Sequence, residues 1–152
     1  MTAIPDLWEP RWIEDGTRQL YAALHPPHGE RARSGVLVVP PLLHELPRSR
    51  RLCTQVAGRL AAFGQPWLGF DFHGTGDTAG TGAEADFASM RGDLELAAQA
   101  LRRDGNVDGL VVLALRGGAL PLASWLAAGG DADAVVLWEP IVDGAARLDE
   151  LQ

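Results

Sequence analysis

The chain has 152 residues, of which 47% are hydrophobic and 22% charged, which is typical of one globular domain with a substantial core. Its net charge at pH 7 is −7, which argues against a nucleic-acid-binding surface, because such surfaces are usually basic. All 13 basic residues are arginine, so chemistry that needs a lysine, such as a phosphate-binding loop or a Schiff base, is excluded.

The N-terminal part of the chain predicts three strands. Residues 7–13 and 17–24 flank Asp15-Gly16, a dipeptide typical of hairpin turns, so they are expected to pair as antiparallel strands. A loop rich in proline and polar residues follows. Residues 35–40 are then a continuous apolar, β-branched run, which indicates a strand that is buried on both faces.

The middle of the chain alternates helices with strands. A helix after residue 47 is expected to turn four apolar side chains to the core: Leu52, Val56, Leu60 and Phe63. A strand over 67–72 and a glycine-rich loop over 73–82 follow, with Thr81 and Glu84 placed as a capping box. The next helix has the clearest amphipathic pattern, carried by Phe87, Met90, Leu94, Ala97 and Leu101.

The last third continues this alternation with a buried strand over 110–115, a helix over 116–128 and a strand over 134–140. From residue 143 onward only a short polar tail is expected. Apolar strands that alternate with amphipathic helices indicate an α/β domain whose mainly parallel sheet is covered on both faces. Ligands of such sheets bind outside the carboxyl ends of the strands, so the loops at that edge are the candidate sites.

The glycine-rich loop in the middle of the chain allows two interpretations. Gly74, Gly76 and Gly80 follow a strand and precede a helix, but their G-x-G-x-x-x-G spacing departs from the G-x-G-x-x-G of dinucleotide-binding loops. Residues 70–80, FDFHGTGDTAG, instead resemble the loop after the fourth strand of α/β-hydrolases. Residues 36–43, VLVVPPLL, resemble the third strand and the oxyanion loop of that superfamily.

A narrower resemblance extends over most of the chain. The segments 24–41, 44–52, 70–80 and 135–144 are similar to exosortase A system-associated hydrolases of the second type. This resemblance implies a cytoplasmic α/β-hydrolase linked to bacterial exosortase and exopolysaccharide loci, which hydrolyses an ester, a thioester or an amide if it is active. It also implies a three-layer sandwich with a mostly parallel sheet, an antiparallel N-terminal hairpin and missing C-terminal strands, so that residues 1–152 make one incomplete domain.

The catalytic positions are where the sequence departs from this superfamily. Residues 110–118 resemble its nucleophile strand and elbow, whose motif is G-x-S-x-G, but Arg116 stands at the nucleophile position. Arginine is permanently charged and is no nucleophile. The base of the triad comes last in this fold, yet no histidine follows His73. Glu139 and Asp143 are candidate acids with no base to orient, so whether the protein is an enzyme stays open.

A candidate anion site remains at the same edge of the sheet. By the resemblance, the backbone amides of Leu42 and Gly117 occupy the two oxyanion-hole positions. Arg116 adds a positive charge beside them, and helix N-termini favour anions there. An elbow that holds arginine in place of serine therefore suits the binding of a carboxylate or phosphate better than the cleavage of an ester.

Other polar side chains of this edge are candidates for ligand binding. The arginines near the start of the helix after residue 47 either join the anion site or pair with Glu45 or sheet-edge carboxylates; they are Arg48, Arg50 and Arg51. His44 is a candidate local acid or base, and His73 and Asp77 are candidate ligand contacts. Alternatively, the histidines bond the backbone, and Asp71 and Asp77 bind loop amides. A metal cluster of the two histidines with Glu45 and Asp77 lacks diagnostic spacing, and no metal or cofactor is expected.

Compartment and partners are the remaining expectations. The single cysteine, Cys53, excludes an internal disulfide framework and is expected to pack as a small core residue. The N-terminus lacks the pattern of a secretion signal and no apolar run is long enough for a membrane span, so the cytoplasm is expected. The strand over 134–139 would leave an exposed apolar edge, which favours a homodimer.

Three functions stay open on this basis. The first is hydrolysis, as the resemblance implies. The second is a non-catalytic relative that binds an anionic small molecule or a partner protein. The third treats the chain as a truncated fragment of a longer hydrolase.

Overall fold

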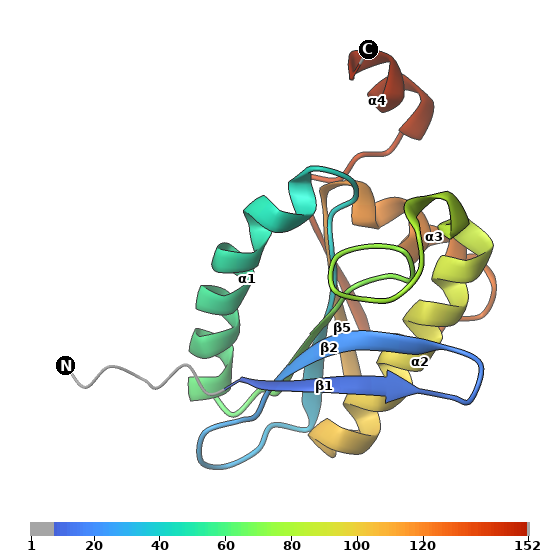
Figure 1. Ribbon diagram of the computed structural model, residues 1–152. Coiled ribbons are helices and arrows are strands. Elements are labelled where there is room, and N and C mark those ends of the chain that lie inside the picture. The colour runs from blue at the N-terminus through green and yellow to red at the C-terminus, as the bar shows by residue number, and fades with distance from the viewer. Residues whose placement is uncertain (1–7, 152) are drawn as a thin grey trace.

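The computed structural model describes residues 8–151, which form a six-stranded mixed sheet with helices on both faces (Figure 1). The strands are β1 Glu9–Glu14, β2 Gln19–His25, β3 Ser34–Val39, β4 Trp67–Phe70, β5 Gly109–Leu115 and β6 Ala134–Trp138, in the order β1-β2-β4-β3-β5-β6. β2 pairs antiparallel with β1 and β4, whereas β3, β4, β5 and β6 pair in parallel. The predicted mostly parallel sheet with an antiparallel N-terminal hairpin is confirmed.

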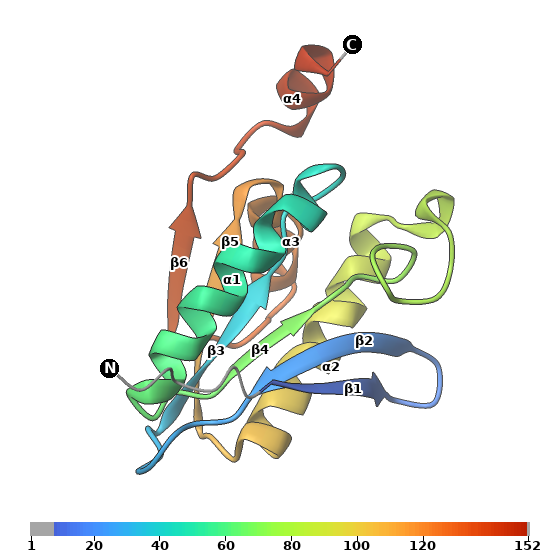
Figure 2. The ribbon, with the colours of Figure 1, turned by 60° about the vertical axis from the view of Figure 1, so that its left-hand side comes forward.

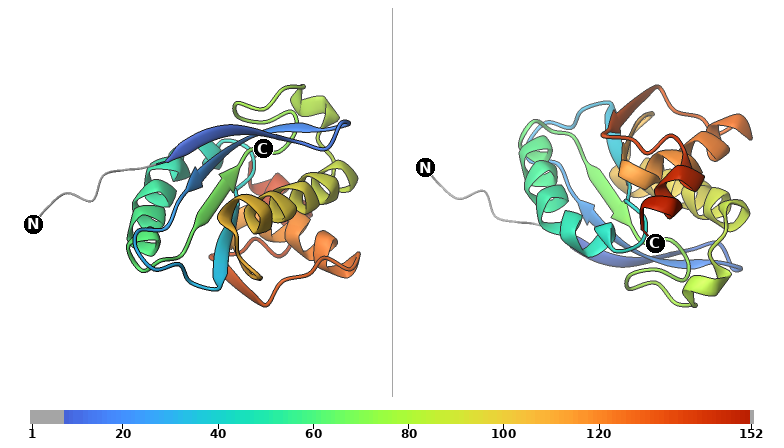
Figure 3. Two further views of the ribbon diagram at one scale, coloured as in Figure 1. Left: turned by 90° about the horizontal axis from the view of Figure 1, so that it is seen from below. Right: turned by 90° about the horizontal axis from the view of Figure 1, so that it is seen from above.

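Four α-helices accompany this sheet in the described part of the chain. They are α1 Glu45–Ala62, α2 Phe87–Gly105, α3 Ala119–Ala127 and α4 Gly144–Glu150. α1 lies on one face of the sheet, and α2 and α3 lie on the other, which makes the predicted three-layer sandwich (Figure 3). The short helix α4 lies beyond the end of β6, outside these layers (Figure 2).

The turn between β1 and β2 shows how local sequence fixes the hairpin. Gly16 adopts a φ of +90°, which glycine tolerates without steric cost. The Asp15 carboxylate accepts hydrogen bonds from the Thr17 hydroxyl and from the backbone N–H groups of Thr17 and Arg18. These bonds, led by that of the hydroxyl, lower the pKa of Asp15 to about 2. The predicted Asp-Gly turn is confirmed.

Two apolar clusters, one on each face of the sheet, make the core. Successive residues of a strand point to opposite faces, so Leu37 of β3 packs in the cluster under α2 and α3 while Val36 packs under α1. The cluster under α2 and α3 is the larger of the two. Four of the five apolar residues predicted to face the core from α2 are buried in it: Met90, Leu94, Ala97 and Leu101.

Three positions predicted to face the core were wrong: one inside α1, one directly after α1 and one at the start of α2. Leu52 is 42% exposed, Phe63 is 82% exposed and Phe87 is 48% exposed. Ala57 and Ala61 are buried in α1 instead, because small side chains let the helix approach the sheet closely. Phe63 follows the last residue of α1 and Phe87 is the first residue of α2, so the sheet covers neither.

The segment after residue 143, predicted only as a polar tail, folds as the helix α4. The Asp143 carboxylate caps this helix by accepting the backbone N–H of Ala146 at 3.0 Å. Seven residues are too few for a hydrophobic period to be visible in the sequence. Within residues 8–151, no helix has the length and apolar character needed to cross a membrane.

Candidate functional site

The turn from β5 into α3 has the geometry of a nucleophile elbow. Arg116 follows β5 directly and adopts a φ of +51°, a strained conformation for a residue other than glycine. A Cβ added to Gly118 would lie 2.5 Å from the carbonyl oxygen of Pro40, which shows that the turn packs closely against the end of β3. A sharp strand-to-helix turn with an arginine at its apex therefore lies where the elbow is predicted, and its role as an elbow stays a prediction.

The Arg116 side chain is held by carboxylate and carbonyl groups from two other segments. Its Nε donates to Glu45 Oε1 at 3.2 Å, and its Nη1 donates to the carbonyl oxygen of Glu139 at 3.3 Å. Arg147 of α4 donates to the same Glu45 oxygen at 3.3 Å. The carbonyl oxygen of Arg116 accepts the N–H of Ile141 at 3.1 Å. Arg116 thus links α1, the segment after β6 and, through Glu45, α4.

A cleft of about 1140 Å³, called here the elbow cleft, opens beside this turn. Its walls are the loop before α1, the loop between β4 and α2, the first turn of α2, the elbow and α4. Of the candidate residues named from the sequence, five line it: Leu42, His44, Glu45, Arg50 and Gly117. Among the described residues, five other candidates lie outside its lining: Arg48, Arg51, His73, Asp77 and Arg116.

The two residues of the predicted oxyanion site lie next to each other in this cleft. A Cβ added to Gly117 would lie 3.4 Å from the Cβ of Leu42, an ordinary contact distance. The next residue, Leu43, has a φ of +59°, so the loop turns sharply just before α1. The predicted approach of the two backbone segments is therefore present, while their part in binding stays a prediction.

Arg50 joins the two aspartates that follow β4. Its Nη2 donates to Asp71 Oδ2 at 2.7 Å, and its Nη1 donates to Asp77 Oδ2 at 3.0 Å. The backbone N–H of Asp77 also donates to Asp71, at 2.8 Å. Burial by itself lowers the pKa of Arg50, but the two carboxylates raise it overall. The interpretation that an arginine of α1 pairs with sheet-edge carboxylates is confirmed for Arg50.

Arg48 and Arg51 behave differently from Arg50. Both side chains are exposed, and neither forms an ion pair with another described residue. His44 precedes α1 and is exposed, and its side chain does not cap the helix. Within the described part of the chain, no three His, Cys, Asp or Glu side chains gather in a metal-binding group, so the weighed metal cluster does not form.

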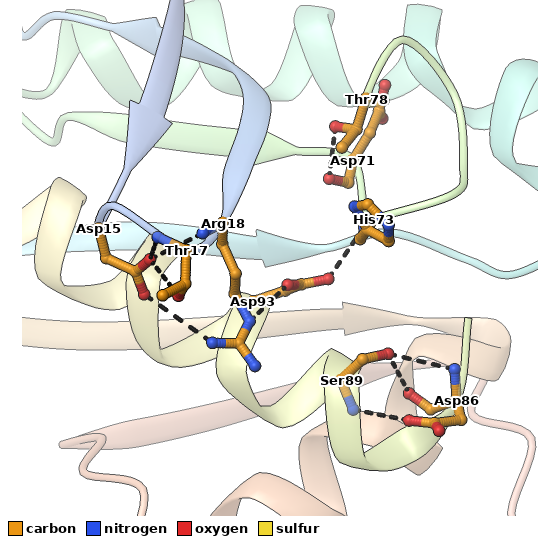
Figure 4. A network of polar contacts seen from close by, with 9 residues as sticks. All are labelled: Asp15, Thr17, Arg18, Asp71, His73, Thr78, Asp86, Ser89 and Asp93. Atoms are coloured by element: carbon orange, nitrogen blue, oxygen red, sulfur yellow. Dashed lines mark hydrogen bonds and ion pairs between the residues drawn. The ribbon is translucent and has the colours of Figure 1, made fainter. Parts of the chain in front are cut away.

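The loop after β4 is anchored by buried polar residues that sequence reasoning missed (Figure 4). The Asp93 carboxylate, at the sheet side of α2, accepts the backbone N–H of His73 at 2.9 Å and lies 3.4 Å from Arg18 Nε. The hydroxyl of Thr78 donates to the carbonyl oxygen of Asp71 and accepts the N–H of Tyr21. The available signal was a carboxyl group on an apolar helix face, directly before Leu94.

The buried position of Asp93 predicts a pH dependence of stability. Burial raises the pKa of Asp93, and the His73 amide and Arg18 offset this only in part. As the pH rises above about 4, the Asp93 carboxyl ionises in the unfolded chain while it is still protonated in the folded protein. The free energy of unfolding that Asp93 contributes therefore falls until the pH has passed the folded pKa. Asp93→Asn keeps an acceptor for His73 and cannot ionise.

We therefore expect urea unfolding to show Asp93→Asn gaining stability relative to the wild type between pH 4 and pH 7. Asp86→Asn is the matched control, because Asp86 is exposed and its amide bonds lower its pKa. Because a lowered pKa places its pH dependence below about pH 4, the stability of that control relative to the wild type is expected to stay nearly constant over this range. Parallel pH profiles for wild type and Asp93→Asn would contradict the assignment.

Comparison with known proteins identifies the fold to which this strand order and turn belong. No protein-family model and no curated protein matches the chain. Among solved structures, it is similar to an α/β serine hydrolase homologue from Coxiella burnetii, with 21% identity and a TM-score of 0.71 over 92% of this chain and 67% of that one. It is also similar to an α/β serine hydrolase without a lid from Xanthomonas campestris, with 20% identity and a TM-score of 0.68 over 90% of this chain and 63% of that one.

A third similar structure is that of a Butyrivibrio proteoclasticus protein with ferulic acid bound, at 18% identity and a TM-score of 0.70. The chain is covered over 93% of its length there and spans 55% of the other protein. The strand order of the sheet, the sharp turn after β5 and these similarities all indicate the same fold. The chain has the α/β-hydrolase fold.

Proposed function

We propose that the protein binds an acyl-type ligand in the elbow cleft and does not cleave it. The observation that carries this proposal is Arg116 at the apex of the elbow, with its guanidinium bonded to Glu45 and Glu139. A guanidinium cannot attack a carbonyl carbon. The fold and the cleft are nevertheless present beside that turn.

The lining of the elbow cleft fits an extended apolar ligand. Large apolar side chains stand in its walls, including Leu43 and Phe87, which are 63% and 48% exposed, and the buried Phe72 and Met90. Exposed apolar side chains that gather in a concave site are typical of ligand-binding surfaces. The alkyl part of an acyl chain would cover them and remove them from water.

The polar end of the ligand is assigned to the backbone of the elbow. The amides of Leu42 and Gly117 adjoin the cleft, and a carbonyl or carboxylate oxygen placed between them would accept their hydrogen bonds. Arg116 itself stands outside the lining and faces carboxylates. A neutral acyl ester is therefore expected to bind about as well as the corresponding acid.

Binding of 4-nitrophenyl decanoate tests this proposal. We expect the ester to bind, as measured by calorimetry, with no release of nitrophenol above the rate in buffer. Leu120→Arg places a charge in the cleft and should weaken binding by about tenfold or more, through loss of a contact worth roughly 1.4 kcal/mol. Leu52→Arg, on the exposed side of α1, is the matched control and should bind as the wild type does.

Comparison of decanoate with methyl decanoate separates the anionic ligand from the neutral one. Equal affinity supports an acyl ligand held by its chain and by backbone amides. A strong preference for decanoate that Arg116→Ala removes would instead support the anion site. Turnover of the nitrophenyl ester that Leu120→Arg abolishes would contradict the non-catalytic proposal.

Hydrolysis of an ester, thioester or amide is the second candidate function. It is favoured by the backbone of Arg116, which keeps the strained φ of an elbow, and by the hydrolases among the similar structures. A cytoplasmic role in an exosortase or exopolysaccharide system is a further proposal, which rests on the resemblance of segments 24–41, 44–52, 70–80 and 135–144. Loss of exopolysaccharide on deletion of the gene, restored by the wild-type chain, is the expected result.

We also propose that two copies of the chain associate through β6. All five residues of this edge strand are exposed, and Val135, Val136 and Leu137 are 41%, 49% and 50% exposed. A second copy offers the same unpaired, apolar edge. Light scattering is expected to show a dimer that Val136→Lys converts to a monomer, while Leu52→Lys leaves it intact. A monomeric wild type at high concentration would contradict this.

A further inference from the structure

A second cavity, of about 230 Å³, lies between α1 and the sheet face that α1 covers. Its floor contains Ala23 of β2 and Gly69 of β4, which are direct partners in the antiparallel register. The flanking residues of the two strands that line it are large or polar: Tyr21, His25, Trp67 and Asp71. Its roof is α1, through Ser49, Cys53 and Thr54. Two small residues side by side therefore create a depression in an otherwise filled sheet face.

Gly69 has no conformational reason to be glycine. Its φ lies outside the left-handed region, and a Cβ added there would meet only Trp67 Nε1, at 3.8 Å. Glycine inside a strand weakens the strand, and it often marks a place that a ligand approaches closely. What Gly69 provides here is open space above the sheet.

The Trp67 indole points a hydrogen-bond donor into that space. Trp67 is 2% exposed, and its Nε1 lies 3.8 Å from the position that a Gly69 side chain would occupy. No described residue accepts a hydrogen bond from this N–H. This Nε1 atom is not among the fully buried polar atoms that lack a partner, so it is open to the cavity, where water or a bound molecule can accept its hydrogen bond. The cavity therefore presents a donor that a bound molecule would satisfy.

We propose that this cavity binds a neutral, single-ring aromatic molecule with one carbonyl oxygen, which accepts a hydrogen bond from Trp67 Nε1. A cavity of about 150 Å³ holds benzene, so 230 Å³ suits one ring with a short substituent. The remaining walls are apolar and include Trp8, Val38 and Leu46. This site shares Leu46 and Arg50 with the lining of the elbow cleft, whereas Cys53, Trp67 and Gly69 belong to it alone.

The charges at the Arg50 end of the cavity favour a neutral ligand. Arg50 lines the cavity there, but Asp71 and Asp77 already hold its guanidinium. One cation therefore faces two carboxylates, and a carboxylate ligand would add a further negative charge. We expect acetophenone to bind, and benzoate, of similar size but charged, to bind much more weakly.

The chain carries its own reporter of occupancy. Cys53 is its single cysteine and lines the cavity from α1. Burial raises the pKa of the Cys53 thiol, so alkylation is best followed at mildly alkaline pH. A molecule in the cavity would shield this sulfur from a reagent, whereas a molecule bound elsewhere would not.

The experiment titrates the full chain with acetophenone and follows the five indole N–H signals by NMR, together with alkylation of Cys53 by iodoacetamide. We expect the Trp67 signal, assigned with Trp67→Phe, to shift while the signals of Trp12 and Trp138 stay in place. Alkylation of Cys53 should slow by at least about fivefold at saturation, in proportion to the occupied fraction. Ethylbenzene, which lacks the oxygen, should produce neither effect at the same concentration.

Gly69→Val provides the decisive variant, because its side chain would occupy the cavity and its Cβ would meet only Trp67 Nε1, at 3.8 Å. It is expected to fold with at least wild-type stability and to lose the acetophenone-dependent shift of Trp67. Failure of acetophenone to shift Trp67 in the wild type would overturn the proposal, as would a shift that persists in Gly69→Val. Neither result depends on binding in the elbow cleft, which the Leu120→Arg variant tests separately.

Discussion

Replacement of Gly118 by alanine is expected to destabilise the protein by about 3 kcal/mol, because the new methyl group collides with main-chain atoms that cannot move aside. An added Cβ would lie 2.5 Å from the carbonyl oxygen of Pro40 and 2.9 Å from that of Val39. To accommodate it, the elbow would have to separate from the end of β3, an interior strand of the parallel part of the sheet. Urea unfolding at neutral pH measures this loss.

The neighbouring glycine supplies a matched control for this prediction. The three atoms nearest to a Cβ added to Gly117 belong to the Leu42 side chain, at 3.4 to 3.5 Å, so Gly117→Ala should change the free energy of unfolding by less than about 1 kcal/mol. The two variants add the same methyl group one residue apart, so general effects on α3 are shared. Equal stabilities of Gly117→Ala and Gly118→Ala would contradict the packing assigned to the elbow.

The fold was predictable because its signals are local and repeated. The apolar runs of β3 and β5 are long enough to show strands that are buried on both faces, and the period of α2 shows its core face. The α1 helix was harder, since alanines carry its buried face and the pattern of larger side chains placed Leu52 inside. Small residues bury little surface, so hydrophobic periodicity alone gives them too little weight.

The position of the candidate site could be predicted from the sequence, but the partners of its arginine side chains could not. The motif spacing placed Arg116 at the elbow, yet nothing near it in sequence indicates that Glu45, 71 residues away, would bind its guanidinium. Arg50 shows the same limit, because three arginines lie close together in sequence and only their positions on the helix decide which one reaches Asp71. Such pairings depend on the angle at which α1 crosses the sheet, which no local pattern encodes.

The strained backbone of Arg116 shows that this edge of the sheet has the sharp turn of an elbow even though its residue is an arginine. An arginine at φ +51° costs conformational free energy that a glycine would avoid. Its side chain bonds to Glu45 and Glu139, which ties the turn to the start of α1 and to the segment after β6. In a serine hydrolase the elbow aims a nucleophile. Here the same turn directs a side chain that fastens the walls of the elbow cleft.

Removal of the Asp71 carboxylate is the second change with a large expected effect. The Asp71 side chain is 7% exposed and accepts hydrogen bonds from Arg50 and from the backbone N–H of Asp77. Asp71→Ala leaves that amide without its acceptor and takes away the buried partner of Arg50. Because Arg50 is 43% exposed and can regain water, we expect a loss of about 2 kcal/mol rather than the 3 to 5 kcal/mol typical of a fully buried pair.

Asp77→Ala is the matched control, since it removes a carboxylate that binds the same Arg50 but is 62% exposed. An exposed ion pair contributes little, so this variant should lose less than about 0.5 kcal/mol in the same urea titration. Loss of Asp71 should also loosen the loop between β4 and α2, seen as faster amide exchange at Asp77 and its neighbours. If both variants lose the same stability, Asp71 does not anchor the loop between β4 and α2. Thr78 and Asp93 must then hold this loop, which forms one wall of the elbow cleft.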